Sequence, residues 1–137
     1  SGEMLQSRPE LTWQYRSEIE KACRGADFYR GHEVIAQIEV QKPNTLVLTQ
    51  DVDGFSRRAG SHNLIEIHGH LREIYCSECD YKDTVDDFEA LDVPPRCPEC
   101  GGPVRPDVVL FGELLPEDKV ERLYREVDLG FDMLFSV

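Results

Sequence analysis

Long apolar runs and targeting signals are missing from this sequence of 137 residues. No stretch is long and apolar enough to span a bilayer. A signal peptide, a lipidation motif and a low-complexity tract are absent as well, and no internal repeat is visible apart from two short cysteine turns. The hydrophobic share of 40% suits a chain with one core, so we expect a globular protein with no membrane partner.

Positive charge is also scarce in this chain. Lysine and arginine number 15 against 27 aspartate and glutamate residues, and the formal net charge is −12. A protein that binds duplex nucleic acid needs a basic surface to displace counterions, so we expect no direct nucleic-acid binding. A lysine-rich peptide would be attracted to this surface, although an acidic surface is most often only a solubility feature.

A glycine-rich phosphate loop is the third missing feature, since the sequence contains no G-x-G. Such a loop at the start of a helix is the usual cradle for a dinucleotide in an α/β fold. If the chain takes part in dinucleotide binding, it therefore holds only part of that site.

Cysteines, in contrast, are present in an informative pattern of two C-x-x-C doublets. Cys76 and Cys79 are followed, after 17 intervening residues, by Cys97 and Cys100. This spacing is typical of a ribbon in which four thiolates hold one structural Zn²⁺ ion and leave no position for water. Free or disulfide-linked cysteines and a redox dithiol are the alternatives. Cys23 is expected to be an ordinary buried thiol, and thiols held by a metal indicate a reducing, cytoplasmic location.

Apolar side chains at helical spacing predict three helices. The first begins at Pro9, the second spans about 33–39, and the third opens at Pro116. Their apolar faces consist of Leu11, Tyr15, Ile19 and Ala22, of Val34, Ile35 and Ile38, and of Val120, Leu123, Tyr124 and Val127. Trp13 lies off the first face, where an aromatic residue is more often part of the core than a contact for a partner segment.

Short apolar runs predict four β-strands, at 45–49, 64–68, 107–111 and 133–137. The first run shows no polar alternation, as a strand buried on both faces of a parallel sheet would. Strands that alternate with helices indicate an α/β fold with a parallel sheet. The metal ribbon, at about 71–106, would be inserted between the second and third strands. Because the fourth run reaches the last residue, we expect an incomplete sheet and a longer protein.

Five motifs in the same order make this chain similar to the sirtuins. They are Thr49-Gln50-Asp51-Val52-Asp53-Gly54, Arg58-Ala59-Gly60-Ser61, Ile67-His68-Gly69, the two cysteine doublets, and Arg105-Pro106-Asp107-Val108-Val109-Leu110-Phe111-Gly112-Glu113. Sirtuins are NAD-dependent protein deacylases, and the resemblance covers about residues 32–137. It implies a Rossmann-type NAD-binding domain, here 1–70 and 107–137, and a small zinc-binding domain, here 71–106. An acyl-lysine protein or peptide would bind in the cleft between them.

The resemblance also implies roles for individual residues. His68 would be the general base that deprotonates the nicotinamide ribose, a task that suits an imidazole at cellular pH. Together with His68, the loop residues Gln50, Asp51 and Asp53 would bind NAD through its nicotinamide ribose and carboxamide. The substrate-binding segment would consist of Val108, Val109, Leu110, Phe111, Gly112 and Glu113, with Val109 and Phe111 on the face of a strand that lines the acyl-lysine channel. His32, His62 and His70 are expected to be structural.

Some positions depart from the sirtuin pattern. The family usually has asparagine at the position of Asp51, and a carboxylate there cannot donate a hydrogen bond. Ser56 stands where a histidine is common, and Phe28-Tyr29-Arg30 replaces a Pro-Asn pair. The expected function is NAD-dependent lysine deacylation with release of nicotinamide and O-acyl-ADP-ribose. The alternatives are ADP-ribosyl transfer, which Asp51 would favour, and a zinc-stabilised peptide-binding module without turnover.

Overall fold

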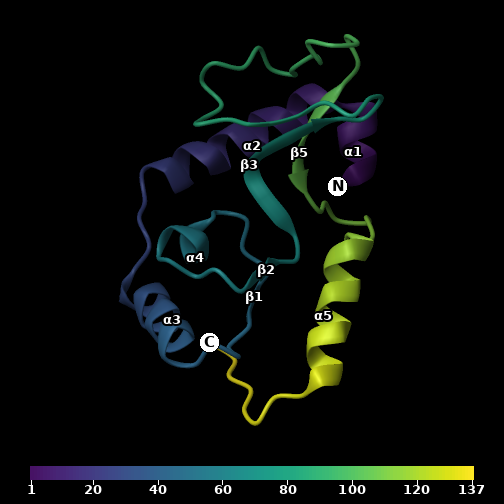
Figure 1. The fold of residues 1–137 in the computed structure, drawn as a ribbon. Coiled ribbons are helices and arrows are strands. Elements are labelled where there is room, and N and C mark those ends of the chain that lie inside the picture. The colour runs from purple at the N-terminus through teal and green to yellow at the C-terminus, as the bar shows by residue number, and fades with distance from the viewer.

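The computed structural model describes residues 1–137 as five helices and five strands (Figure 1). In chain order they are α1 (Gly2–Ser7), α2 (Pro9–Arg24), α3 (Arg30–Gln41), β1 (Val47–Thr49), α4 (Phe55–Arg58), β2 (Leu64–Glu66), β3 (Gly69–Cys76), β4 (Lys82–Thr84), β5 (Val104–Val108) and α5 (Glu117–Leu129). None of the helices combines the length and the apolar character that crossing a bilayer requires.

The strands form two separate sheets. β1 and β2 pair in parallel, with Val47 opposite Leu64 and Thr49 opposite Glu66. β3 is the central strand of an antiparallel sheet with the order β4-β3-β5. In Figure 1 this sheet lies with α1 and α2 at one end of the molecule, while β1, β2, α3 and α4 lie at the other and α5 runs along the side. The predicted parallel arrangement is confirmed for the first two strands.

The main hydrophobic core lies between α2 and the antiparallel sheet. Its buried members are Trp13, Leu71, Ile74, Cys76, Phe88, Cys97 and Val104. Trp13 is fully buried, its indole Nε1 donates a hydrogen bond to the Val104 carbonyl at 3.3 Å, and its ring meets Phe88 edge-on at 5.3 Å between centroids. Trp13 is therefore a core residue, as the sequence indicated. The division into 1–70 with 107–137 and 71–106 stays a prediction, and this core contains residues from both parts.

The predicted apolar face of the first helix is right for Ile19, which packs against the main core, and wrong for Leu11 and Tyr15. Leu11 and Tyr15 are 41% and 68% exposed, whereas α2 buries Thr12, Trp13 and Glu20. The reason is that the large indole finds both an apolar core and a carbonyl acceptor, which a stripe of smaller side chains cannot offer. Glu20 tolerates burial because the guanidinium groups of Arg24 and Arg72 lie 3.6 Å and 3.5 Å from its carboxylate.

Two strand predictions are also wrong. The segment 107–111 is not a third parallel strand, because only Asp107 and Val108 belong to β5, and β5 pairs antiparallel with β3. The segment 133–137 forms no strand and is exposed. The apolar composition of a segment does not determine which strand it pairs with. Both runs also lie next to polar or turn-forming residues, which do not favour a long strand.

The parallel pair and α5 leave apolar surface uncovered. Leu48 in β1 is 48% exposed, so this strand is not buried on both faces as expected. α5 is confirmed as a helix, but it contains no buried residue, and Tyr124 and Val127 on its apolar face are 66% and 53% exposed. The antiparallel sheet, α1 and α2 therefore contain most of the well-packed core of this chain.

Truncation of the core indole tests this assignment. We expect Trp13→Ala to destabilise the zinc-loaded chain by about 3–5 kcal/mol, because it leaves a cavity and removes the hydrogen bond to Val104. Tyr15→Ala on the exposed side of α2 should change stability by less than about 0.5 kcal/mol. Urea unfolding followed by circular dichroism measures both, and equal losses would contradict the observed orientation of α2.

Candidate functional site

The four doublet cysteines converge on one point. Cys76 ends β3, and Cys79 follows it in a turn, while Cys97 and Cys100 lie in a second turn before β5. The Sγ atoms of Cys76 and Cys100 are 3.5 Å apart, as are those of Cys79 and Cys97, and all four lie within 4.8 Å of one another. This arrangement fits a tetrahedral four-thiolate zinc site with no open coordination position. The predicted metal ligands are thus brought together.

Protonation differs sharply within this cysteine quartet. For Cys79, the Tyr81 N–H favours the thiolate, but burial and the three neighbouring cysteines outweigh it and raise the pKa to about 12. For Cys97, burial opposes ionisation, yet backbone N–H groups of Cys100 and Glu99 and the neighbouring thiols lower the pKa to about 7. Without metal the quartet therefore holds protons that Zn²⁺ must displace, since all four ligands bind as thiolates.

His68 lies in the turn between β2 and β3 and is partly exposed. Its ring Nδ1 is 3.1 Å from the carbonyl oxygen of Gln50, and its own carbonyl accepts a hydrogen bond from the Val109 N–H at 2.8 Å. The next residue, Gly69, has a φ of 89°, and a side chain there would overlap the carbonyl oxygen of Asp107. Glycine thus allows the backbone of β5 to approach the turn that carries His68.

The loop after β1 lies beside this histidine. The Asp51 N–H donates to the Thr49 hydroxyl at 3.1 Å, and the Asp51 side chain is exposed. Asp53 is half-buried, and its Oδ1 accepts the Phe55 N–H at 2.9 Å at the start of α4. Part of the Asp53 side chain is therefore engaged in holding the loop itself. The structure brings the backbone carbonyl of Gln50 and the ring of His68 together, and the role of these residues in binding NAD stays a prediction.

The predicted substrate segment differs from a regular strand. β5 ends at Val108, and the chain then turns at 111–112, so that Val108 and Leu110 are buried while Phe111 is 91% exposed. Val109 and Phe111 consequently do not lie on one face of a strand, which corrects that expectation. The Val109 N–H is used by His68, and the Phe111 carbonyl accepts the Gly2 N–H at 3.2 Å.

Arg105 and Glu113 form a clamp on this segment, and no role for Arg105 was expected from the sequence. The two guanidinium nitrogens each lie 2.8 Å from a different carboxylate oxygen of Glu113, which also accepts the Leu110 N–H at 2.8 Å. Arg105 lowers the pKa of Glu113, against the opposing effect of burial. A basic and an acidic residue eight positions apart across a turn are a weak signal in sequence, because only the fold aligns their planes.

Two of the three histidines outside the candidate site pack against other residues of the fold, whereas His62 is exposed. Burial lowers the pKa of His70, whose ring lies against Gly54, and its Nδ1 accepts the Arg72 N–H at 3.2 Å. The His32 ring packs edge-on against Tyr29 and Phe55 near the start of α3.

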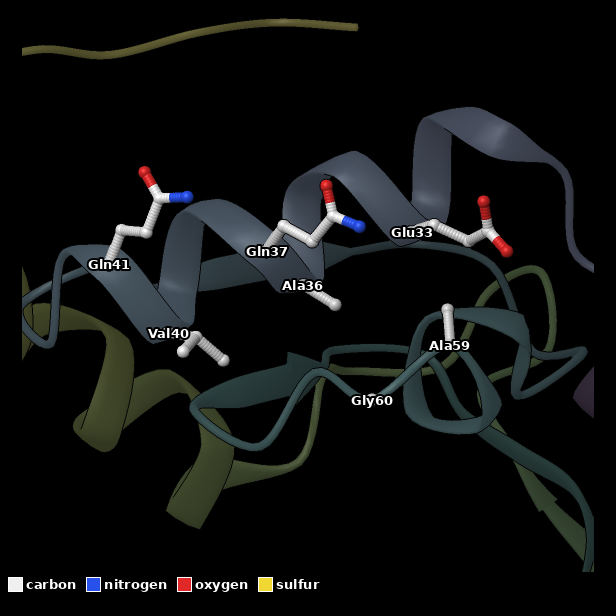
Figure 2. Close-up of a pocket in the computed structure, with 7 residues that line it drawn as sticks. All are labelled: Glu33, Ala36, Gln37, Val40, Gln41, Ala59 and Gly60. Atoms are coloured by element: carbon white, nitrogen blue, oxygen red, sulfur yellow. The ribbon is translucent and has the colours of Figure 1, made fainter.

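A surface groove of about 410 Å³ lies between α3 and the segment after α4 (Figure 2). Its lining consists of Glu33, Ala36, Gln37, Val40, Gln41, Ala59 and Gly60. Figure 2 shows Ala36 and Val40 pointing toward Ala59 and Gly60, while the glutamines point away. The groove contains neither a histidine nor a cysteine, and none of the predicted site residues lines it.

Comparisons with known proteins agree on one family. The sequence model of the Sir2 family matches residues 1–137. The NAD-dependent protein deacylase 2 of Pseudomonas aeruginosa is 47% identical over 140 residues, which cover 100% of this chain and 55% of that protein. The NAD-dependent protein deacylase 1 of Caldanaerobacter subterraneus subsp. tengcongensis is 40% identical over 116 residues, which cover 85% of this chain and 48% of that protein. The chain thus spans about half the length of the curated relatives it matches.

Solved structures give the same result. A Sir2 homologue in complex with NAD superposes with a TM-score of 0.87 at 32% identity, over 94% of this chain and 50% of that one. A structure described as Sir2 with a p53 peptide and NAD⁺ superposes with a TM-score of 0.81 at 33% identity, over 90% of this chain and 53% of that one.

Metal content tests the cysteine quartet. We expect one zinc ion per chain, and Cys97→Ser should abolish stoichiometric zinc and loosen the antiparallel sheet, because three thiolates no longer close the tetrahedron. Cys23→Ser is the matched control, since Cys23 is half-buried and lies outside the quartet. Elemental analysis with circular dichroism measures the result, and full zinc in Cys97→Ser would refute the assignment.

The clamp predicts a pH-dependent contribution to stability. Arg105 lowers the folded pKa of Glu113 below its ordinary value of 4.5, so the carboxylate stabilises the fold above that value and loses this effect as the pH falls through the folded pKa. Glu113→Gln should cost about 1–2 kcal/mol at pH 7, and the difference from wild type should shrink below pH 4.5. Urea unfolding at several pH values measures this, with Glu121→Gln on exposed α5 as the control. A difference that is constant with pH would contradict the ion pair.

Proposed function

Because this chain belongs to the Sir2 family, we propose that the whole protein that contains it is an NAD-dependent protein lysine deacylase. It would consume NAD, one water molecule and an acyl-lysine protein or peptide, and release nicotinamide, O-acyl-ADP-ribose and free lysine. The reaction moves the acyl group from lysine to a sugar hydroxyl, which makes the protein a transferase by reaction class.

The position of His68 is the observation that carries this proposal. Its Nδ1 faces a carbonyl oxygen, that of Gln50, so this nitrogen must carry a proton and donate it. In the neutral ring, Nε2 then holds the free lone pair and can accept a proton. The hydrogen bond from the Val109 N–H to the His68 carbonyl joins the backbone of this residue to the segment proposed to bind the peptide. The base, the cofactor loop and the peptide segment thus meet at one turn.

The residues around His68 fit a nicotinamide riboside. The Asp51 carboxylate is exposed in the loop after β1, and Asp53 retains one carboxylate oxygen that α4 does not use, so both can accept hydrogen bonds from sugar hydroxyls. When bound, NAD supplies the ribose carbon that receives the acyl oxygen as nicotinamide leaves, together with a ribose hydroxyl. His68 takes the proton of that hydroxyl at Nε2, and the Gln50 carbonyl stabilises the imidazolium that results.

Zinc has no catalytic part in this proposal. Four cysteine thiolates fill a tetrahedron, so the ion cannot bind water or a substrate oxygen, and its effect is to hold the turns at the ends of β3 and β5.

The peptide partner is supported by backbone geometry and by charge. The chain passes from Val108 to Glu113 close to His68, and an extended peptide can be recognised there by main-chain hydrogen bonds. The net charge of −12 favours basic peptides around the acyl-lysine. We also propose a cytoplasmic location, because four reduced thiols are needed to bind the metal.

Asp51 favours ADP-ribosyl transfer as a second candidate function. A carboxylate in the nicotinamide loop cannot donate a hydrogen bond to the acyl oxygen or to water, as an amide can. Mass spectrometry of acetylated and unacetylated target peptides incubated with NAD separates the two reactions. Loss of the acetyl group identifies deacylation, and a gain of ADP-ribose on the peptide identifies the transfer.

Replacement of the proposed base tests the main proposal. In the whole protein, His68→Ala should lower NAD-dependent deacylation by at least about 100-fold, because no other group at this turn takes the ribose proton. Its zinc content should equal that of wild type, since His68 is not a metal ligand. His62→Ala at an exposed position is the control and should retain full activity. Deacylation by His68→Ala at the wild-type rate would show that the assigned role is wrong.

A further inference from the structure

Glu66 is a buried carboxylate that the reaction as described does not use. It is the last residue of β2, its side chain is 7% exposed, and its Oε1 has no hydrogen-bond partner. Its neighbours Ile65 and Ile67 are both buried. Removing a carboxylate from water is costly even when it is paired, and an apolar side chain at this position would avoid that cost. Stability alone therefore gives no reason for a glutamate here.

The side chain of Glu66 is attached to α4 through Arg57. One guanidinium nitrogen of Arg57 donates to Glu66 Oε2, and the other donates to Glu73 Oε1 at 2.9 Å. α4 is the direct continuation of the loop that contains Gln50, Asp51 and Asp53. The ion pair thus joins the helix that follows the cofactor loop to the strand that leads into His68.

The backbone of Glu66 is attached to α5 by a second cation. Lys119 Nζ donates a hydrogen bond to the Glu66 carbonyl at 2.9 Å. One turn further along α5, Arg122 donates to the Leu64 carbonyl at 2.9 Å. The two carbonyls lie on the same edge of β2, because residues two apart in a strand share an edge. This edge is therefore held by side-chain donors where another strand would otherwise pair.

Both attachments act on the residue two positions before His68. Ile67 lies between Glu66 and His68 in the chain. Its N–H donates a hydrogen bond to the Thr49 carbonyl at 3.0 Å, which joins β1 to the turn that contains His68. A base must lie within hydrogen-bond reach of the proton that it takes, so a small shift of this turn would matter for the rate. We propose that Glu66 is a positioning residue for His68. Its side chain fixes the end of β2 against α4 through Arg57, and its backbone carbonyl is held against α5 by Lys119.

This inference rests on the proposed function, because it assigns Glu66 an effect on the step that His68 performs. It predicts a specific division between kcat and KM. The peptide segment follows β5 and makes no hydrogen bond or ion pair with Glu66, so its affinity should not change. The rate of the His68 step should fall, because the imidazole no longer stays aligned with the cofactor loop.

Steady-state kinetics of the whole protein test the inference. Glu66→Gln keeps the shape of the side chain and an acceptor oxygen, and it should lower kcat about 10-fold; Glu66→Ala should lower kcat about 100-fold. KM for the acyl peptide should stay within about twofold of wild type in both, as should zinc content. Partial rescue by glutamine relative to alanine is expected because Arg57 retains one hydrogen bond. A change in the peptide KM with kcat unaltered would overturn the proposal.

Two further variants show whether the attachments act through Glu66. In a double-mutant cycle, Arg57→Met combined with Glu66→Gln should reduce kcat no more than the stronger single variant. Arg57→Met alone removes the partner of the Glu66 side chain and should also lower kcat, which keeps the test valid if the Glu66 variants fold poorly, and Lys119→Met tests the attachment of the Glu66 carbonyl to α5 in the same way. Asp27→Asn is the matched control. It breaks the exposed 2.8 Å ion pair between Asp27 and Arg58, which follows Arg57 in α4, and it should change kcat less than about twofold. Additive losses in the cycle would contradict the proposal.

Hydrogen exchange separates failure of this inference from failure of the proposed function. In Glu66→Gln, the amides of Ile67 and Val109 should exchange faster, because they bond to Thr49 and to His68 at the held turn. The Gly101 amide, which bonds to Cys97 in the zinc site, should be unchanged. If wild type does not deacylate, the proposed function fails, and faster exchange would still establish the attachment. Unchanged exchange at Ile67 and Val109 would overturn the positioning role whatever the activity.

Discussion

Closure of the four-thiolate quartet is the constraint on which the rest of the structure depends. Cys76 ends β3 opposite Val104, the first residue of β5, so the ion would hold the two strands together where they begin to pair. Cys76 and Cys97 are also core residues in contact with the cluster around Trp13. Metal binding and packing of α2 would therefore stabilise the same small core.

The path from this metal site to the proposed chemistry follows the backbone. β3 and β5 run side by side away from the cysteines, and at their far end Gly69 lies against the Asp107 carbonyl. There the Val109 N–H reaches the carbonyl of His68. The same two strands thus carry the metal site at one end and the proposed base beside the peptide segment at the other, although their register shifts between Ile74 and His70.

Features that depend on residues close together in the sequence are predictable from it, whereas features that depend on contacts with distant segments are not. The cysteine spacing was sufficient to predict the quartet, and the helices beginning at Pro9 and Pro116 were recognised from their periodicity. The buried face of α2 was missed, because the burial of Glu20 requires Arg72 from β3. The run 107–111 was assigned to the wrong sheet, since apolar composition does not identify the strand that pairs with it. Arg105 was overlooked because its partner Glu113 lies across a turn.

The sequence by itself determined the clustered cysteines, the helices that begin near Pro9 and Pro116, and the residue types that a proton-transfer site needs, because these follow from spacing and side-chain chemistry along the chain. Only the tertiary structure decided which face of each helix is buried, that β5 pairs antiparallel with β3, and that Glu66 receives Arg57 and Lys119 from two different helices. The physical reason is that the burial and ion pairing of a side chain depend on its surrounding, which is formed by segments distant in the sequence. A residue's own neighbours in sequence do not specify that surrounding.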